Sequence, residues 1–134
     1  MTTLHEAWEL SRADKGLAVV STLRADGTIQ SSLVNTGIVG ERLAFVTYGA
    51  VKLANLRSRP AVTTTFRAGW KWATVEGTAT LTGPGDTDPD TLRLLLREIF
   101  QAAGGTHDDW DAYDQVMRDQ GRTAVLITPT RVYG

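Results

Sequence analysis

The sequence predicts a mainly β protein with short helices, in which one antiparallel sheet curls into a closed or half-closed barrel. Short β-branched segments are separated by turn signals, of which Asp26-Gly27 is the clearest. Regular alternation of strands and helices is absent, which argues against a doubly wound parallel sheet. Closing the sheet would remove exposed strand edges. The 134 residues fit a single domain, residues 1–134, because two halves would each bury too small a core.

The strands are predicted from β-branched runs and from alternation of side chains along the chain. Six are expected, over residues 16–24, 28–39, 42–48, 61–67, 70–81 and 122–128. The first three form an antiparallel meander, because short turns that contain glycine join them. Pro129 is expected to end the last strand.

Four short helices complete the expected fold. Two of them cover residues 3–14 and 49–59, and the other two begin near residues 90 and 108. Thr3 and Glu6 have the spacing of a capping box, which predicts the first helix. The last two helices each carry an apolar stripe at helical spacing, which predicts that they pack on the sheet.

The composition excludes several classes of protein. There is no cysteine, which excludes disulfides, zinc-thiolate sites and cysteine nucleophiles. A net charge of -1 gives no basic field that would attract nucleic acid or an anionic membrane. The N-terminal residues lack the pattern of a signal peptide, and no apolar stretch approaches the ~20 residues that span a bilayer. We therefore expect a cytoplasmic protein that binds neither nucleic acid nor membranes.

No catalytic constellation stands out in the sequence. Both the GxGxxG dinucleotide fingerprint and the GxxxxGK[ST] phosphate loop are missing. The two histidines, His5 and His107, have no neighbours at metal-ligand spacing, so no metal site is expected. The sequence therefore assigns no catalytic residue.

Lys52 is the first positive signal. It follows a strand and falls in the first turn of the expected helix over residues 49–59. A lysine there is unfavourable with the helix dipole, and an anion bound at the strand-helix junction would remove the conflict. The alternative is a solvated lysine at a helix start.

Two tryptophans and a polar strand are the second signal. Trp70 and Trp72 are two residues apart on an expected strand, so they point to the same face, where they could stack on a planar ring or form a core or dimer contact. Gln30 and Ser32 share one face of the strand over residues 28–39. Polar groups in mid-strand are either exposed or committed to a ligand.

Five segments, in their order and spacing, carry a resemblance. They are LAVVSTLRADGTIQSSLVN at 17–35, KLANLRSRP at 52–60, GWKWATVEG at 69–77, DDWDAY at 108–113 and TRVYG at 130–134. Together they resemble the pyridoxamine-phosphate-oxidase-like split-barrel superfamily, and within it the branch of coenzyme F420-dependent (deazaflavin) oxidoreductases. The resemblance covers nearly the whole chain.

The resemblance implies a six-stranded antiparallel split β-barrel of the FMN-binding type, and a homodimer with two coenzyme sites at the subunit interface. It implies that Lys52 binds the coenzyme phosphate and that the tryptophans close the pocket across the dimer. The implied coenzyme-binding residues are Gln30, Ser32, Asn35, Thr47, Ala50, Lys52, Trp70 and Trp72. Ala50 stands where relatives often carry a further basic residue, so we expect binding of the phosphate or of a polyglutamate tail either to be weaker or to use Arg57 or Arg24 instead.

Three functions follow from the resemblance. The first is an F420-dependent oxidoreductase that transfers a hydride to a small, conjugated organic substrate, with a proton from solvent or Tyr133. Because the coenzyme carries the hydride, the protein needs mainly to bind, orient and exclude water. The second is an FMN-binding flavoprotein or flavin reductase of the same fold. The third is a protein that binds coenzyme without turnover.

Overall fold

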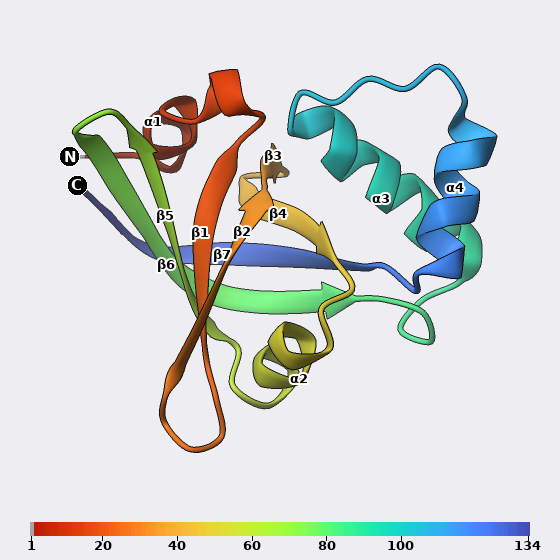
Figure 1. The fold of residues 1–134 in the computed structure, drawn as a ribbon, viewed down its shortest axis with the longest axis horizontal. Coiled ribbons are helices and arrows are strands. Elements are labelled where there is room, and N and C mark those ends of the chain that lie inside the picture. Colours follow the sequence, from red (N-terminus) through yellow and green to blue (C-terminus); the bar gives the residue numbers. More distant parts are fainter. Residues whose placement is uncertain (1) are drawn as a thin grey trace.

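The computed structural model describes residues 2–134 and contains one curled antiparallel sheet with helices around it (Figure 1). The strands are β1 (Leu17–Leu23), β2 (Ile29–Asn35), β3 (Gly37–Val39), β4 (Arg42–Thr47), β5 (Ala61–Ala68), β6 (Lys71–Thr82) and β7 (Thr123–Tyr133). The α-helices are α1 (Leu4–Glu9), α2 (Ala50–Ser58), α3 (Pro89–Ala102) and α4 (Trp110–Asp119). A 3-10 turn at Arg12–Asp14 follows α1. The sheet order is β2-β1-β5-β6-β7-β4-β3, which makes a half-barrel of the split type.

The prediction of six strands was wrong, because the segment over residues 28–39 forms two strands. The first, β2, pairs with β1, whereas β3 pairs with β4 at the other end of the sheet. The change of partner occurs at Thr36, whose backbone N–H and Oγ1 both donate to the carbonyl of Gly16. Trp8 Nε1 donates to the Thr36 carbonyl at 2.9 Å. These long-range bonds hold the bend and bring the two ends of the sheet towards one another.

Two strand boundaries also differ from expectation. β7 continues past Pro129 to Tyr133, because a register shift opposite Glu76 and Gly77 accommodates the proline, which has no N–H to donate. At the β5–β6 hairpin Ala68 pairs with Lys71, so the turn consists of Gly69 and Trp70. Gly69 has a φ of 63°, the conformation that a two-residue hairpin requires at its first position. Trp70 therefore lies in the turn and not on the strand.

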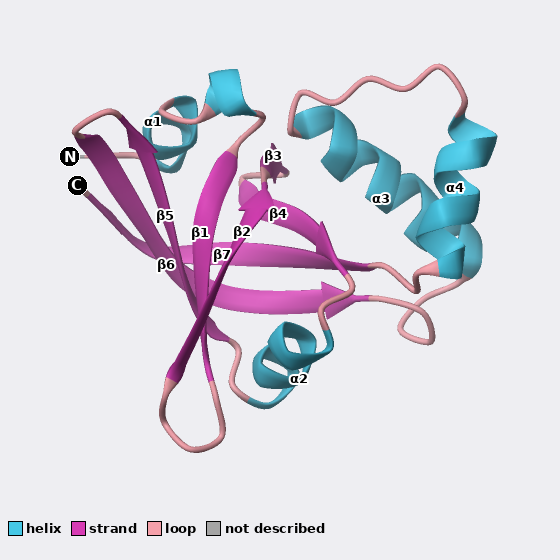
Figure 2. Ribbon diagram, viewed as in Figure 1, coloured by secondary structure: helices cyan, strands magenta, loops and turns pink. Residues whose placement is uncertain are grey.

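Apolar side chains form a core on each face of β4 and β7. The larger core fills the barrel, and α1 and α2 contribute Trp8 and Leu56 to it. The smaller core lies between the other face of these strands and α3, where Leu96 and Ile99 pack on Leu126. Figure 2 shows α3 and α4 together on this side, away from α1 and α2. Because β7 is covered by a core on both of its faces, five consecutive residues of this strand are buried.

Helix ends follow the local sequence. Thr3 and Glu6 form both bonds of the expected capping box. Asp88 caps α3, so this helix begins at Pro89, slightly earlier than expected. Asp109 caps α4 by accepting from the backbone N–H of Ala112. No helix within residues 2–134 combines the length and the apolar character needed to cross a membrane.

Candidate functional site

A cavity of about 520 Å3 lies where the ends of β2 and β4 and the start of α2 face the α3–α4 pair. Its lining comes from Leu33, Val34, Asn35, Val46, Thr47, Tyr48, Gly49, Lys52, Ile99, Phe100, Ala103, Tyr113, Met117 and Arg122. Most of these side chains are apolar or aromatic, and they could contact a planar ring. The two cations, Lys52 and Arg122, are the only charged residues of the lining, which contains no acidic side chain. The cavity is therefore suited to a planar ligand that carries a negative charge.

Lys52 is the strongest indication that this cavity binds an anion. Its side chain is only 7% exposed, and it makes no hydrogen bond or ion pair within residues 2–134. Its Nζ lies 5.6 Å from the centre of the Phe45 ring. Burial lowers the pKa of the Lys52 ammonium group from its ordinary value. A buried cation without an anionic partner is costly, and a bound anion would offset that cost.

The start of α2 adds backbone donors next to Lys52. Gly49 is the N-cap and no side chain caps the helix, so the first N–H groups are open to a ligand. The helix dipole makes this end attractive to negative charge. The local sequence produces the geometry, because β4 ends at Thr47 and its Oγ1 accepts from the Gly49 N–H at 3.2 Å. Ala50 is exposed in the first turn and leaves this approach clear.

Three of the eight predicted residues line the cavity: Asn35, Thr47 and Lys52. Asn35 approaches from the end of β2, where its Nδ2 lies 3.3 Å from the carbonyl of Lys15. Ala50 is next to them at the start of α2. The structure thus brings together residues from β2, β4 and α2 that are up to 17 positions apart in the chain.

Gln30 and Ser32 lie on the inner face of β2, outside the lining of this cavity. Gln30 Oε1 accepts from Thr22, whose Oγ1 in turn accepts from Asn55 on α2. This chain of bonds ties β2 and β1 to the helix that carries Lys52. Ser32 Oγ is buried and has no hydrogen-bond partner among the described residues. A buried hydroxyl without a partner is unfavourable, so a ligand could supply the missing bond.

The two tryptophans lie elsewhere in this chain. Trp70 is fully exposed in the β5–β6 turn, and Trp72 is about half exposed. Figure 1 shows this hairpin near both termini, at the other end of the sheet from α2. Trp72 packs edge-on against Tyr133, with ring centres 6.3 Å apart. Tyr133 donates to Glu76 at 2.7 Å, and this hydrogen bond raises the pKa of Tyr133.

Arg122 was not predicted to lie at the site, but it is the second basic residue of the cavity lining. Arg57 pairs with Asp86 at 2.9 Å, and Arg24 bonds within the β1–β2 turn. Neither lines the cavity. The Arg122 guanidinium lies 4.0 Å from the centre of the Tyr48 ring, which holds it at the cavity wall.

On the α3–α4 side the cavity has a wall formed by Phe100, Tyr113 and Met117, which the sequence did not predict. Phe100, Tyr113 and Met117 lie on the apolar stripes that predicted packing, but the stripes do not show that part of each faces a cavity. Tyr113 donates to the carbonyl of Leu96 at 3.1 Å, and burial raises the pKa of Tyr113 to about 12. This wall is therefore neutral at physiological pH.

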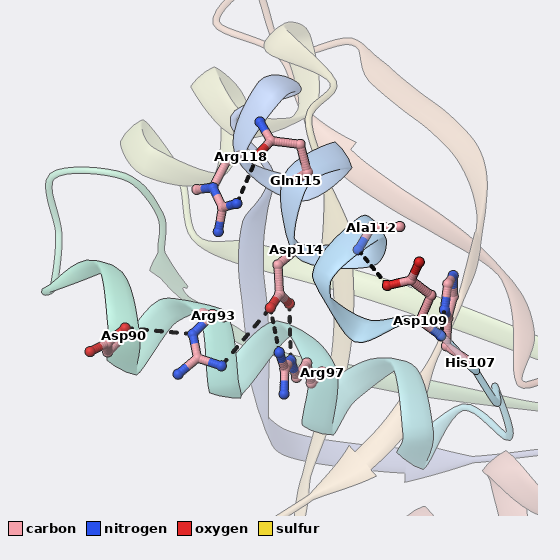
Figure 3. Close-up of polar contacts among 9 residues, drawn as sticks. All are labelled: Asp90, Arg93, Arg97, His107, Asp109, Ala112, Asp114, Gln115 and Arg118. Atoms are coloured by element: carbon pink, nitrogen blue, oxygen red, sulfur yellow. Dashed lines mark hydrogen bonds and ion pairs between the residues drawn. The ribbon is translucent and has the colours of Figure 1, made fainter.

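An ion pair fixes α4 on α3 and so positions the wall (Figure 3). Asp114 on α4 is buried and accepts two bonds from Arg97 on α3, of which the Nε–Oδ1 bond is 2.9 Å long. These bonds hold the pKa of the Asp114 carboxyl below its ordinary value. Within residues 2–134 no cluster of three or more His, Cys, Asp or Glu side chains could hold a metal ion.

Comparison with known families gives a match over almost the entire chain. A family model described as pyridoxamine 5'-phosphate oxidase matches residues 4–134. The chain belongs to this family. The match includes every strand, α2 and the α3–α4 pair, and it confirms the resemblance that the sequence motifs indicated.

Solved structures of the family fold agree with this membership. A conserved hypothetical protein from Mycobacterium tuberculosis has a TM-score of 0.74 at 17% identity, over 98% of this chain and 83% of the other. An F420 reductase has a TM-score of 0.64 at 20% identity, over 87% of this chain and 88% of the reductase chain. A pyridoxamine 5'-phosphate oxidase-related, FMN-binding protein from Nostoc punctiforme has a TM-score of 0.64 at 14% identity, over 96% and 80%. At these identities the similarity shows the shared fold.

Proposed function

We propose that the chain binds coenzyme F420 with its phosphate at Lys52 and acts as an F420-dependent oxidoreductase. The observation that carries the proposal is Lys52, which is buried at the uncapped start of α2 and has no partner within the described part of the chain, in a cavity whose described lining has no acidic side chain. The apolar wall of the same cavity suits the planar deazaflavin ring. An F420 reductase is among the proteins that share the fold.

The residues of the chain have binding and positioning roles in this proposal. Lys52 and the first N–H groups of α2 hold the phosphate, and Asn35 lies in the cavity lining, where it can contact the ring. Phe100 and Tyr113 exclude water from one side of the cavity. The bound coenzyme supplies hydride transfer, so no strong acid or base is required of the protein. The substrate is a small, planar, electron-poor organic molecule that stacks on the ring.

We further propose that the protein acts as a homodimer in the cytoplasm, with each site completed by the partner. The outer face of β1 and β2 exposes Leu17, Val19, Leu23, Ile29 and Leu33. An exposed apolar patch of this kind is typical of an interface. Leu33 belongs both to this face and to the cavity lining, so a second copy on the patch would reach the site. The exposed Trp70 and Trp72 are then free to cover the partner's coenzyme, with Tyr133 beside them.

A titration of the protein with F420 and, separately, with FMN tests the coenzyme. We expect F420 to quench tryptophan emission with micromolar affinity or better, and Lys52→Met to weaken binding about ten- to hundredfold, because one charge-assisted contact is lost. Lys71→Met, which removes an exposed lysine on the face of β6 opposite Trp72, should leave affinity unchanged. Stronger binding of FMN would move the protein to the flavin branch, and binding of neither would refute the proposal.

Sedimentation of Ile29→Glu tests the dimer. Ile29 is 65% exposed, so the monomer tolerates the charge, but a charge buried in the interface would dissociate the dimer. Leu94→Glu on α3 is the matched control, because Leu94 is also more than half exposed and lies away from the β1–β2 face. If Ile29→Glu sediments as the wild type does, this face is not the interface. In the dimer, replacing Trp70 and Trp72 with Phe should also reduce the quenching by F420 and leave the part that comes from Trp110, which packs on Phe100 and Tyr113.

A further inference from the structure

Lys52 differs from the other lysines of the chain in its surroundings. The sequence has three lysines, of which Lys15 and Lys71 are exposed to solvent. Lys15 Nζ also donates to the carbonyl of Gly104 at 3.1 Å. Lys52 is buried in the lining of the cavity of about 520 Å3, and within residues 2–134 it has no hydrogen bond or ion pair. Of the three, Lys52 alone is therefore shielded from bulk water and faces a space that a small molecule can enter.

Three features of this place favour the uncharged amine of Lys52 over the ammonium ion. Burial lowers the pKa of Lys52. The described lining of the cavity contains no carboxylate that would stabilise the cation. Lys52 is also the third residue of α2, where the positive end of the helix dipole disfavours a cation. A desolvated lysine of this kind is suited to attack carbonyl compounds, because only the uncharged amine has a free electron pair.

Arg122 gives the same cavity a separate place for an anionic group. Its guanidinium lies 4.0 Å from the centre of the Tyr48 ring, and its Nε donates to Gln120 at 2.8 Å. These contacts orient the guanidinium group without cancelling its charge, and its remaining N–H groups can bind a carboxylate. Because Arg122 and Lys52 line one cavity, a ligand held at Arg122 by a carboxylate can present a second group to Lys52.

We propose that Lys52 captures small aldehydes that carry a carboxylate, as a reversible imine, with the carboxylate held at Arg122. The electron pair of Nζ attacks the carbonyl carbon, and a proton moves from the nitrogen to the former carbonyl oxygen. The resulting hydroxyl group takes a proton from solvent and leaves as water, and the nitrogen returns one proton to solvent as the C=N bond forms. No oxidant or reductant is needed, and hydrolysis restores the free lysine. This reaction goes beyond the proposed function, because it involves neither the coenzyme nor hydride transfer.

Labelling of the coenzyme-free protein with 4-carboxybenzaldehyde at neutral pH tests the proposal. Cyanoborohydride in the same solution reduces each imine to a stable secondary amine, and peptide mapping by mass spectrometry gives the rate at each lysine. Lys52 should react about ten- to hundredfold faster than Lys71, as expected when one charge-assisted contact holds the aldehyde beside the amine. With benzaldehyde, which lacks the carboxylate, the ratio of the Lys52 rate to the Lys71 rate should fall about tenfold. The ratio removes the difference in intrinsic reactivity between the two aldehydes.

Arg122→Gln tests the place of the carboxylate. In this variant the ratio for 4-carboxybenzaldehyde should fall to the benzaldehyde value, whereas Arg12→Gln, which removes the same charge from the segment after α1, should keep the wild-type ratio. A carboxylate preference that survives in Arg122→Gln would overturn the assignment of Arg122.

Two results on the wild type would overturn the inference without any variant. If Lys52 reacts no faster than Lys71 with 4-carboxybenzaldehyde, Lys52 is not a site of capture. If the ratio is the same for both aldehydes, the cavity does not recognise the carboxylate. Neither measurement uses a coenzyme, so both outcomes are independent of whether the protein binds F420.

Discussion

Lys52 is buried and has no anionic partner among residues 2–134, so its replacement by methionine should make the ligand-free protein more stable. Methionine keeps the unbranched stem and removes the charge. The cation–π contact with Phe45, at 5.6 Å, offsets about 1 to 2 kcal/mol of the cost of burial. The cost of burying an ammonium ion is several kcal/mol in proteins. We therefore expect Lys52→Met to raise the free energy of unfolding by about 1 to 2 kcal/mol.

Urea unfolding followed by circular dichroism measures this difference at neutral pH. With a slope of about 2 kcal/mol per molar, the midpoint should rise by roughly 0.5 to 1 M. Lys71→Met is the control, and because Lys71 is exposed its effect should stay within about 0.5 kcal/mol. A destabilised or unchanged Lys52→Met variant would show that Lys52 is stabilised within the free protein, against the argument for an anion site.

The pH dependence gives a second readout of the same residue. Burial lowers the folded-state pKa of Lys52 below the ordinary 10.5. Between these two values the unfolded chain binds a proton that the folded protein does not, so wild-type stability rises with pH. Lys52→Met lacks this contribution. The difference in free energy of unfolding between the two proteins should therefore shrink as pH increases from the folded-state pKa of Lys52 towards 10.5. A difference that is constant with pH would contradict the assignment.

Three further predictions concern the walls of the site. Burial raises the pKa of Tyr113 to about 12, so its neutral form stabilises the folded protein below pH 10. Between pH 10 and 12 the free energy of unfolding should fall by about 2 to 3 kcal/mol relative to Tyr113→Phe. Asp114→Asn leaves Arg97 without its anion and should lower the free energy of unfolding in urea by about 2 to 3 kcal/mol. A loss under about 0.5 kcal/mol would show that the Asp114–Arg97 pair does not fix α4 on α3. Gly37→Ala places a methyl group 2.6 Å from the backbone of Ala102, so the melting temperature should fall by several degrees. An unchanged melting temperature would mean that α3 is not packed closely on β3.

The parts of the fold that local sequence specifies were predicted well. Asp26-Gly27, the capping box at Thr3 and the strand-helix junction before Lys52 each depend on residues close in the chain. The division of the strand at Thr36 could not be predicted in this way. It depends on bonds to Gly16 and Trp8, which are far away in the sequence, and the segment has continuous strand character.

The candidate site shows the same difference between local and long-range information. Lys52 was predicted from its position at a helix start, family resemblance added Asn35 and Thr47, and all three line the cavity. Arg122 was not identified, because its role depends on where the start of β7 lies relative to Tyr48. The alternation that grouped Trp70 with Trp72 failed at the turn, where Gly69 adopts a positive φ. All the assigned binding roles, including those of Lys52, Gln30 and Ser32, stay predictions.

A crystal structure of the protein with bound F420 tests the central claim most directly. The account predicts the coenzyme phosphate at Lys52 Nζ and the first N–H groups of α2, with the ring in the cavity between Asn35 and the α3–α4 wall. A coenzyme bound elsewhere, with Lys52 still buried and unpaired, would contradict it.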